Sequence, residues 1–199
     1  MTNLDHEAYP DPHHDVYSKT VFGFWIYILT DFILFGVLFA TFAVLKNSTF
    51  GGTPPAQLFN LPRVLVQTLI LLTSSFTIAL GGAYAHRKNK SATLTAFLIT
   101  FGLGLAFVIM QRSEYAQLIA TGNSWQRSAF LSAYFTLVGT HTLHMLFALL
   151  WVIVLMIPVI GQGLTPVSIK RITCLRMFWQ FLNIVWIFIF TIVYLLGVK

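Results

Sequence analysis

Charged residues are scarce in this chain, and acidic residues are the scarcest. Aspartate, glutamate, lysine and arginine together make up 9% of the 199 residues, whereas 57% are hydrophobic. A soluble domain carries about 25% charged residues, so this composition excludes a soluble globular protein and predicts a membrane protein. Basic residues in such proteins orient the chain and meet lipid headgroups, so the net charge of +6 does not indicate a nucleic-acid partner.

Cysteine is nearly absent as well. Cys174 is the only one, which excludes an internal disulfide and any metal site built on paired cysteines. The N-terminus lacks the basic start, short apolar core and small-residue cleavage site of a secretory signal. We therefore expect residues 1–20 to be an acidic, histidine-containing tail of the mature chain, and residues 21–199 to form one transmembrane domain.

Long apolar runs dominate the rest of the sequence. Five segments are long enough to cross a bilayer, which takes about 20 residues, and they cover residues 21–45, 62–85, 92–111, 129–157 and 177–197. We predict an all-α, polytopic bundle of five transmembrane helices. Small residues at four-residue spacing indicate close helix packing on the second and third segments: Ser75, Ala79 and Ala83, then Gly102 and Ala106.

Lysine and arginine are distributed unevenly between the two sides of this bundle. The short connection at residues 86–91 contains Arg87, Lys88 and Lys90, and clusters of this kind stay in the cytoplasm. This pattern predicts a cytoplasmic N-terminus, a connection at residues 46–61 on the outer side, and a C-terminus outside, in the periplasm.

Asp31 lies about ten residues into the first predicted span, near the middle of the membrane. An ionised carboxylate without a partner would cost at least ~2.5 kcal/mol at this depth. We therefore expect Asp31 to be protonated and to hydrogen-bond a neighbouring helix. The alternative is that this intramembrane carboxylate relays protons or gates a pathway.

Glu114 lies at the outer end of the third span, next to Gln111 and Tyr115. Arg112 and Arg127 are candidate partners of this carboxylate, or ligands of lipid phosphate. A solvated helix end is the competing interpretation. Gln111, Arg112, Glu114 and Tyr115 are therefore candidates for a polar network or for the lining of a lipid-binding cleft.

His141 and His144 lie three residues apart on the fourth span, and Gln180 and Asn183 have the same spacing on the fifth. A haem within a bundle needs histidines on facing helices, and zinc or copper needs further ligands, which no other span offers at matching depth. Amides do not titrate, so no acid–base catalysis rests on them. We predict no catalytic residue and no metal or cofactor in this chain, and expect these side chains to bond to other helices or lipid headgroups.

Four stretches together resemble subunit III of the haem–copper terminal oxidases. They are FGFWIYILTDFILFGVLFATFAVLKN at 22–47, MQRSEY at 110–115, FLSAYFTLVGTHTLHM at 130–145 and FWQFLNIVWIFIFTIVYLLG at 178–197. The likeness is strongest to the five-helix subunit III of bacterial cytochrome bo-type ubiquinol oxidases, and it covers residues 21 to 197.

This resemblance implies a fold and a role. It implies a V-shaped helix bundle with phospholipids in its cleft, in the bacterial inner membrane, packed against subunit I and the other subunits of a proton-pumping oxidase. Subunit I would hold the haems and copper and reduce oxygen to water. This chain would be a cofactor-free accessory subunit that stabilises subunit I and contributes to oxygen access and proton uptake.

The resemblance also implies roles for single residues. Asp31 matches the family's membrane-embedded carboxylate, His141 and His144 match its paired histidines, and Glu114 with Tyr115 matches its glutamate–aromatic pair.

At four positions this chain departs from the family's pattern. Gln180 and Asn183 stand where relatives commonly have histidine and aspartate, and Gln67 and Gln111 stand where many quinol-oxidase relatives have acids. Neutral amides do not provide a titrating chain, so we expect these four positions to serve hydrogen bonding or lipid placement.

Two other classes of function remain as alternatives. A haem-bearing membrane anchor of a quinone-linked dehydrogenase can also have five spans, but it needs histidines on facing helices. A small membrane transporter favours broken helices or inverted repeats around a midplane site, and five spans do not divide into such halves.

Overall fold

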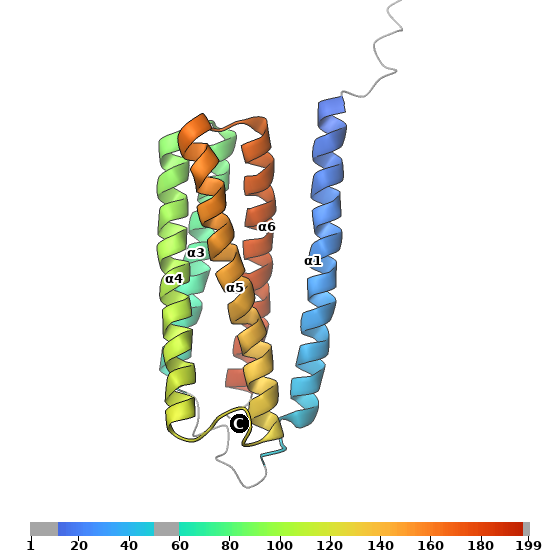
Figure 1. Ribbon diagram of the computed structural model, residues 1–199, viewed down its shortest axis with the longest axis vertical. Helices are drawn as coiled ribbons and strands as arrows, with labels where there is room; N and C mark the ends of the chain where they lie inside the picture. The colour runs from blue at the N-terminus through green and yellow to red at the C-terminus, as the bar shows by residue number, and fades with distance from the viewer. Residues whose placement is uncertain (1–11, 50–59, 197–199) are drawn as a thin grey trace, which may run out of the picture.

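The computed structural model describes residues 12–49 and 60–196, and these ranges are helical apart from short connections (Figure 1). The helices are α1 (Pro12–Leu45), α3 (Leu61–His86), α4 (Lys90–Ala120), α5 (Ala129–Gln162) and α6 (Pro166–Ile189). Helix α6 continues directly into a π-helix, η1 (Phe190–Leu195). Counting α6 and η1 as one segment, five helices among the described residues are long and apolar enough to cross a membrane, which confirms the predicted number of spans.

Side-chain caps start four of these helices. Asn89, Ser128 and Thr165 each accept a hydrogen bond from the backbone N–H three residues later, at 3.2 Å, at the starts of α4, α5 and α6. Asn60 does the same for α3 through a longer bond of 3.4 Å. Because the first N–H groups of a helix have no partner within it, these caps define where each span begins.

Several helices extend beyond the predicted spans. Helix α6 begins at Pro166 rather than near residue 177, and α4 runs on to Ala120. Helix α5 continues through Pro158 to Gln162, and α1 begins at Pro12, within the segment that we expected to be a tail. Hydropathy reports only the apolar part of a helix, whereas polar turns at its ends can leave the hydrocarbon layer without ending the helix.

Helices α3, α4, α5 and α6 form a four-helix bundle, with α1 alongside it (Figure 1). Helix α1 packs on α5 and α6. Within the most apolar part of each span, 56% of residues are buried in α6 but only 22% in α1. Helix α6 is therefore the centre of the molecule, and α1 is its most lipid-exposed element.

Glycines bring neighbouring helices together at particular points. A Cβ atom on Gly104 of α4 would lie 2.7 Å from Cη2 of Trp179 and 3.0 Å from Cδ2 of Leu149. Gly81 of α3 approaches the ring of Phe97 in the same way, at 2.9 Å. Around Gly102, which we expected in a packing ridge, nothing lies within 4 Å, so close packing on α4 occurs at Gly104 instead.

Candidate functional site

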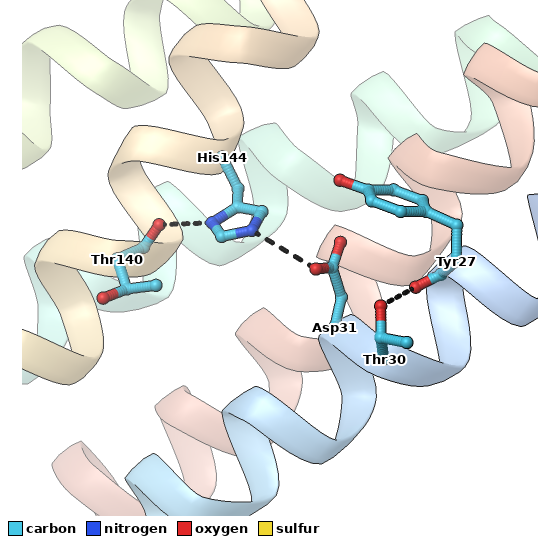
Figure 2. A network of polar contacts seen from close by, with 5 residues as sticks. All are labelled: Tyr27, Thr30, Asp31, Thr140 and His144. Carbon is cyan, nitrogen blue, oxygen red and sulfur yellow. Dashed lines mark hydrogen bonds and ion pairs between the residues drawn. The ribbon is translucent and has the colours of Figure 1, made fainter.

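Asp31 of α1 and His144 of α5 face each other near the middle of the membrane spans (Figure 2). Oδ1 of Asp31 lies 3.9 Å from Nε2 of His144, and Asp31 is 8% exposed. The other carboxylate oxygen, Oδ2, is buried without a hydrogen-bond partner among the described residues. This pair joins α1, the peripheral helix, to the bundle.

The backbone sets the tautomer of His144. Its Nδ1 lies 2.8 Å from the carbonyl oxygen of Thr140, one turn earlier. A carbonyl oxygen can only accept, so Nδ1 carries the hydrogen and Nε2 of the neutral ring presents a lone pair to Asp31. One proton can therefore lie between Asp31 and His144. On the carboxylate it makes Asp31 a neutral acid, and on Nε2 it makes the contact an ion pair.

An apolar groove between α1 and α5 opens beside this pair. One part, of about 500 Å³, is lined by Tyr27, Leu143, His144, Leu146, Phe147 and Leu150. A second part, of about 460 Å³, shares Tyr27, Phe147 and Leu150 and adds Phe24, Trp151 and Val154. Tyr27 lies one turn before Asp31, and its ring extends beside the carboxylate (Figure 2).

His141 has different surroundings from His144. It is fully buried, and its Nε2 donates to the carbonyl oxygen of Leu182 in α6 at 3.1 Å. The rings of Phe107 and Trp186 pack against it, with centroids 5.9 and 5.2 Å away. Within the part of the chain that the structure describes, no three His, Cys, Asp or Glu residues come together as metal ligands.

Glu114 lies in a second polar cluster, with two tyrosines that sequence reasoning missed. Its Oε1 accepts hydrogen bonds from the hydroxyls of Tyr134 at 3.0 Å and Tyr194 at 3.1 Å, and these hydroxyls lie 2.9 Å apart. The arginines predicted as partners lie elsewhere. Arg112 is exposed, and Arg127 donates to the carbonyl oxygen of Gly122 at 3.2 Å.

The amides predicted on α3 and α4 border this cluster. Gln67 lies beside Glu114, and Gln111 lies beside Tyr115 and Tyr194. Both glutamines are fully buried. The structure thus adds Gln67 of α3 to Gln111 and Glu114 of α4, whose three-residue spacing had already placed them together. The hydroxyl of Tyr115 lies 3.2 Å from Oγ1 of Thr142 and connects α4 to α5.

The two amides of α6 make different contacts. Gln180 donates from Nε2 to the carbonyl oxygen of Ser75 at 3.2 Å, and its Oε1 accepts from the Ser75 hydroxyl at 2.5 Å. This two-bond contact ties α6 to α3. Asn183 is buried and donates to the carbonyl oxygen of Trp179 in its own helix at 3.0 Å.

Comparison with known proteins identifies the family. The model of a family described as cytochrome c oxidase subunit III matches residues 4–198. The chain belongs to the cytochrome c oxidase subunit III family. The predicted resemblance to subunit III is thereby confirmed, and with its five apolar helices this family member is a multi-pass membrane protein.

Relatives within the subunit III family align along almost the whole chain. The chain is 49% identical over 187 residues to the cytochrome bo(3) ubiquinol oxidase subunit 3 of Pseudomonas aeruginosa, covering 94% of this chain and 90% of that protein. It is 40% identical over 177 residues to the quinol oxidase subunit 3 of Bacillus spizizenii, covering 89% and 87%. It is 39% identical over 194 residues to the cytochrome c oxidase subunit 3 of Bacillus sp. PS3, covering 96% and 92%.

Proposed function

We propose that this chain is the accessory subunit III of a bacterial terminal quinol oxidase, located in the inner membrane. The near-complete alignment, at 49% identity, with a cytochrome bo(3) ubiquinol oxidase subunit 3 carries this proposal. In the proposed complex, haems and copper belong to subunit I, and this chain stabilises subunit I as a helical partner.

The polar contacts inside the bundle support an accessory role. Gln180, His141 and Tyr115 join helices to one another through hydrogen bonds. The atoms in these bonds are occupied in holding helices together, whereas Nδ1 of His141 is buried without a hydrogen-bond partner among the described residues. These contacts therefore favour a rigid partner subunit over a redox protein.

Co-purification tests the proposal. An affinity-tagged chain, extracted in mild detergent, should bring down the other oxidase subunits, a reduced-minus-oxidised haem spectrum and quinol oxidase activity. The chain separated from that complex should contain neither haem nor copper in stoichiometric amounts. Purification without oxidase subunits, or with haem bound to the chain itself, would contradict the proposal and favour a dehydrogenase anchor.

We further propose that the groove between α1 and α5 is the lipid cleft of a V-shaped bundle. Its walls are almost wholly apolar, and it opens along the membrane spans at Tyr27, Phe147 and Leu150. Phospholipid chains are the apolar ligand available at that depth. Lipid analysis of the purified complex should find retained phospholipid, and Leu150→Trp, which fills the groove, should reduce the retained amount.

The orientation proposed for the chain has its basic end in the cytoplasm. The α3–α4 connection with Arg87 and Lys88 lies at the same end as the α5–α6 connection and the start of α1 (Figure 1). Helix η1 ends at the opposite side. Short basic connections remain in the cytoplasm, so the N-terminus would be cytoplasmic and the C-terminus periplasmic.

A further inference from the structure

The cluster around Glu114 contains more buried polar atoms than the helices provide partners for. It combines Gln67 from α3, Gln111 and Glu114 from α4, Tyr134 from α5 and Tyr194 from η1. Gln67 follows the start of α3 by six residues and Glu114 precedes the end of α4 by six, which places the cluster about 9 Å inside the helix ends. Gln67 and Gln111 are fully buried there, and Glu114 is 8% exposed.

Five atoms of this cluster are buried and unpartnered among the described residues. They are Nε2 and Oε1 of Gln67, Nε2 and Oε1 of Gln111, and Oε2 of Glu114, none of which reaches a partner at full hydrogen-bonding geometry, although Gln67 interacts more loosely with Glu114, and Gln111 with Tyr194. Buried polar groups are almost always hydrogen-bonded, because an unpaired one loses its interactions with water and gains nothing in return. Five such atoms in one cluster indicate that the site binds something further.

The chemistry of the unpartnered atoms selects the ligand. Each amide has a donor and an acceptor to satisfy. Gln67 lies beside the Glu114 carboxylate, and Gln111 lies about one helical turn before it on α4. A metal cation would satisfy the oxygens and leave the amide N–H groups unpaired. An anion only accepts hydrogen bonds and would leave the amide oxygens without donors, and an apolar molecule would satisfy neither kind of atom. Water both donates and accepts, and buried water typically makes about three hydrogen bonds to groups of this kind.

The local backbone also distinguishes this place. Tyr194 belongs to the π-helix Phe190–Leu195, and its hydroxyl contacts both Glu114 and Tyr134. A π-helix has i→i+5 hydrogen bonds and is frequently found at functional sites. Here the π-helix contains Tyr194, the side chain that joins the last span to the cluster.

We propose that Gln67, Gln111 and Glu114 form an internal hydration site, in which ordered water joins the two buried amides to the free carboxyl oxygen. The bound water completes the hydrogen-bond network that Tyr134 and Tyr194 begin. This site is separate from the Asp31–His144 pair, and it adds a water-binding role to the helix-joining contacts described above.

Single Gln→Leu substitutions test the proposal through the sign of their effect on stability. Leucine is close to glutamine in volume and has no polar atom. If water binds the amides, Gln67→Leu or Gln111→Leu removes hydrogen-bond partners of the water and of the remaining polar groups. The unfolding midpoint of the full chain in lipid nanodiscs should then fall by about 2–10 °C. If the amides are buried without partners, each substitution removes a cost and the midpoint should rise, which would overturn the proposal.

Two further measurements complete the test. Gln162→Leu, at an exposed position on the last residue of α5, is the matched control and should leave the midpoint unchanged. A high-resolution cryo-electron microscopy map of the wild-type complex should show water density between Gln67, Gln111 and Glu114. Direct amide–carboxyl hydrogen bonds with no water density would refute the hydration site, even if a Leu variant failed to fold.

Discussion

Asp31 and His144 show how a single backbone carbonyl can determine the chemistry of a pair between two membrane helices. Because the Thr140 carbonyl fixes the hydrogen on Nδ1, Nε2 of the neutral His144 ring can only accept. A hydrogen-bond donor on residue 31 would then complement Nε2 once the two groups close from 3.9 Å to hydrogen-bonding distance, and would add to the apolar packing of α1 on α5 and α6. Asp31 can supply that donor as a neutral acid, without transferring a proton.

Substitution of Asp31 separates a structural role from proton transfer. Asp31→Asn keeps the size and a donor, so we expect the complex to assemble and quinol oxidation to fall by less than about tenfold. Asp31→Leu leaves the Nε2 lone pair unpartnered, at about 1–3 kcal/mol, and should loosen the complex. Steady-state oxidation and proton pumping by the assembled Asp31→Asn complex are the measurements.

The opposite outcome for Asp31→Asn is equally specific. An intact complex whose turnover or pumping falls by about a hundredfold or more would identify Asp31 as a proton carrier. His144→Gln offers a control, because its amide can still donate to Asp31 or accept from it while it cannot titrate near neutral pH.

The sequence alone indicated the charged and amide side chains that interrupt apolar runs, but it did not indicate the two tyrosines that contact Glu114. Asp31 and Glu114 stand out because acids are rare in these spans. Tyr134 and Tyr194 carry no such signal, since tyrosine is common in membrane helices and only its hydroxyl is polar. Their importance depends on three helices meeting at Glu114, which is a property of the tertiary structure.

Among the helices, the closest contact described above is at Gly104. Gly104→Ala would place a methyl group 2.7 Å from Trp179, a buried ring with little freedom to move. We expect a loss of about 1–3 kcal/mol in unfolding free energy, as is usual for overpacking. Gly102→Ala, two residues earlier with nothing within 4 Å, should be neutral or slightly stabilising. Equal effects of the two substitutions on reversible unfolding in detergent would contradict this packing.

The contact between α3 and α6 at Ser75 and Gln180 can be measured by a double-mutant cycle. Interhelical hydrogen bonds in membranes contribute about 0.6 kcal/mol each. Ser75→Ala removes the hydroxyl bond alone, whereas Gln180→Leu removes that bond and the bond to the Ser75 carbonyl. The coupling energy of the pair should be about 0.6 kcal/mol, and a value near zero would show that the hydroxyl contact does not stabilise the bundle.

Helix number followed from the sequence, but helix ends did not. Lys170, Arg171 and Arg176 lowered the hydropathy of residues 166–176, yet these residues are helical in α6. Long basic side chains can extend toward the membrane surface while their backbone remains helical. The sequence also did not predict the π-helix η1, because its composition does not differ from that of an ordinary apolar α-helix.

The proposed orientation of the chain across the membrane is testable with one added cysteine. Cys174 is buried, so it gives a low labelling background. A cysteine at Asn89, in the α3–α4 connection, should react with a membrane-impermeant maleimide only after cells are opened, since this connection is proposed to be cytoplasmic. Labelling of Asn89→Cys in intact cells would show that the α3–α4 connection is outside and that the proposed orientation is wrong.

The arrangement of the helices was the part least accessible to sequence reasoning. In lipid, apolar residues face both neighbouring helices and acyl chains, so the apolar pattern does not distinguish the central α6 from the peripheral α1. Only scattered polar residues mark an inward face, and Asp31 is the single acid on α1 within the described spans. The structure shows which helix is central and which is peripheral.

The peripheral position of α1 has a consequence for biosynthesis. Helix α1 leaves the ribosome first, yet it packs on α5 and α6, which are made last. The α3–α4 hairpin is adjacent in sequence and can pair as soon as it is inserted. During translation, α1 therefore enters the bilayer before its packing partners α5 and α6 have been synthesised. The first helix to be inserted is among the last to reach its final contacts.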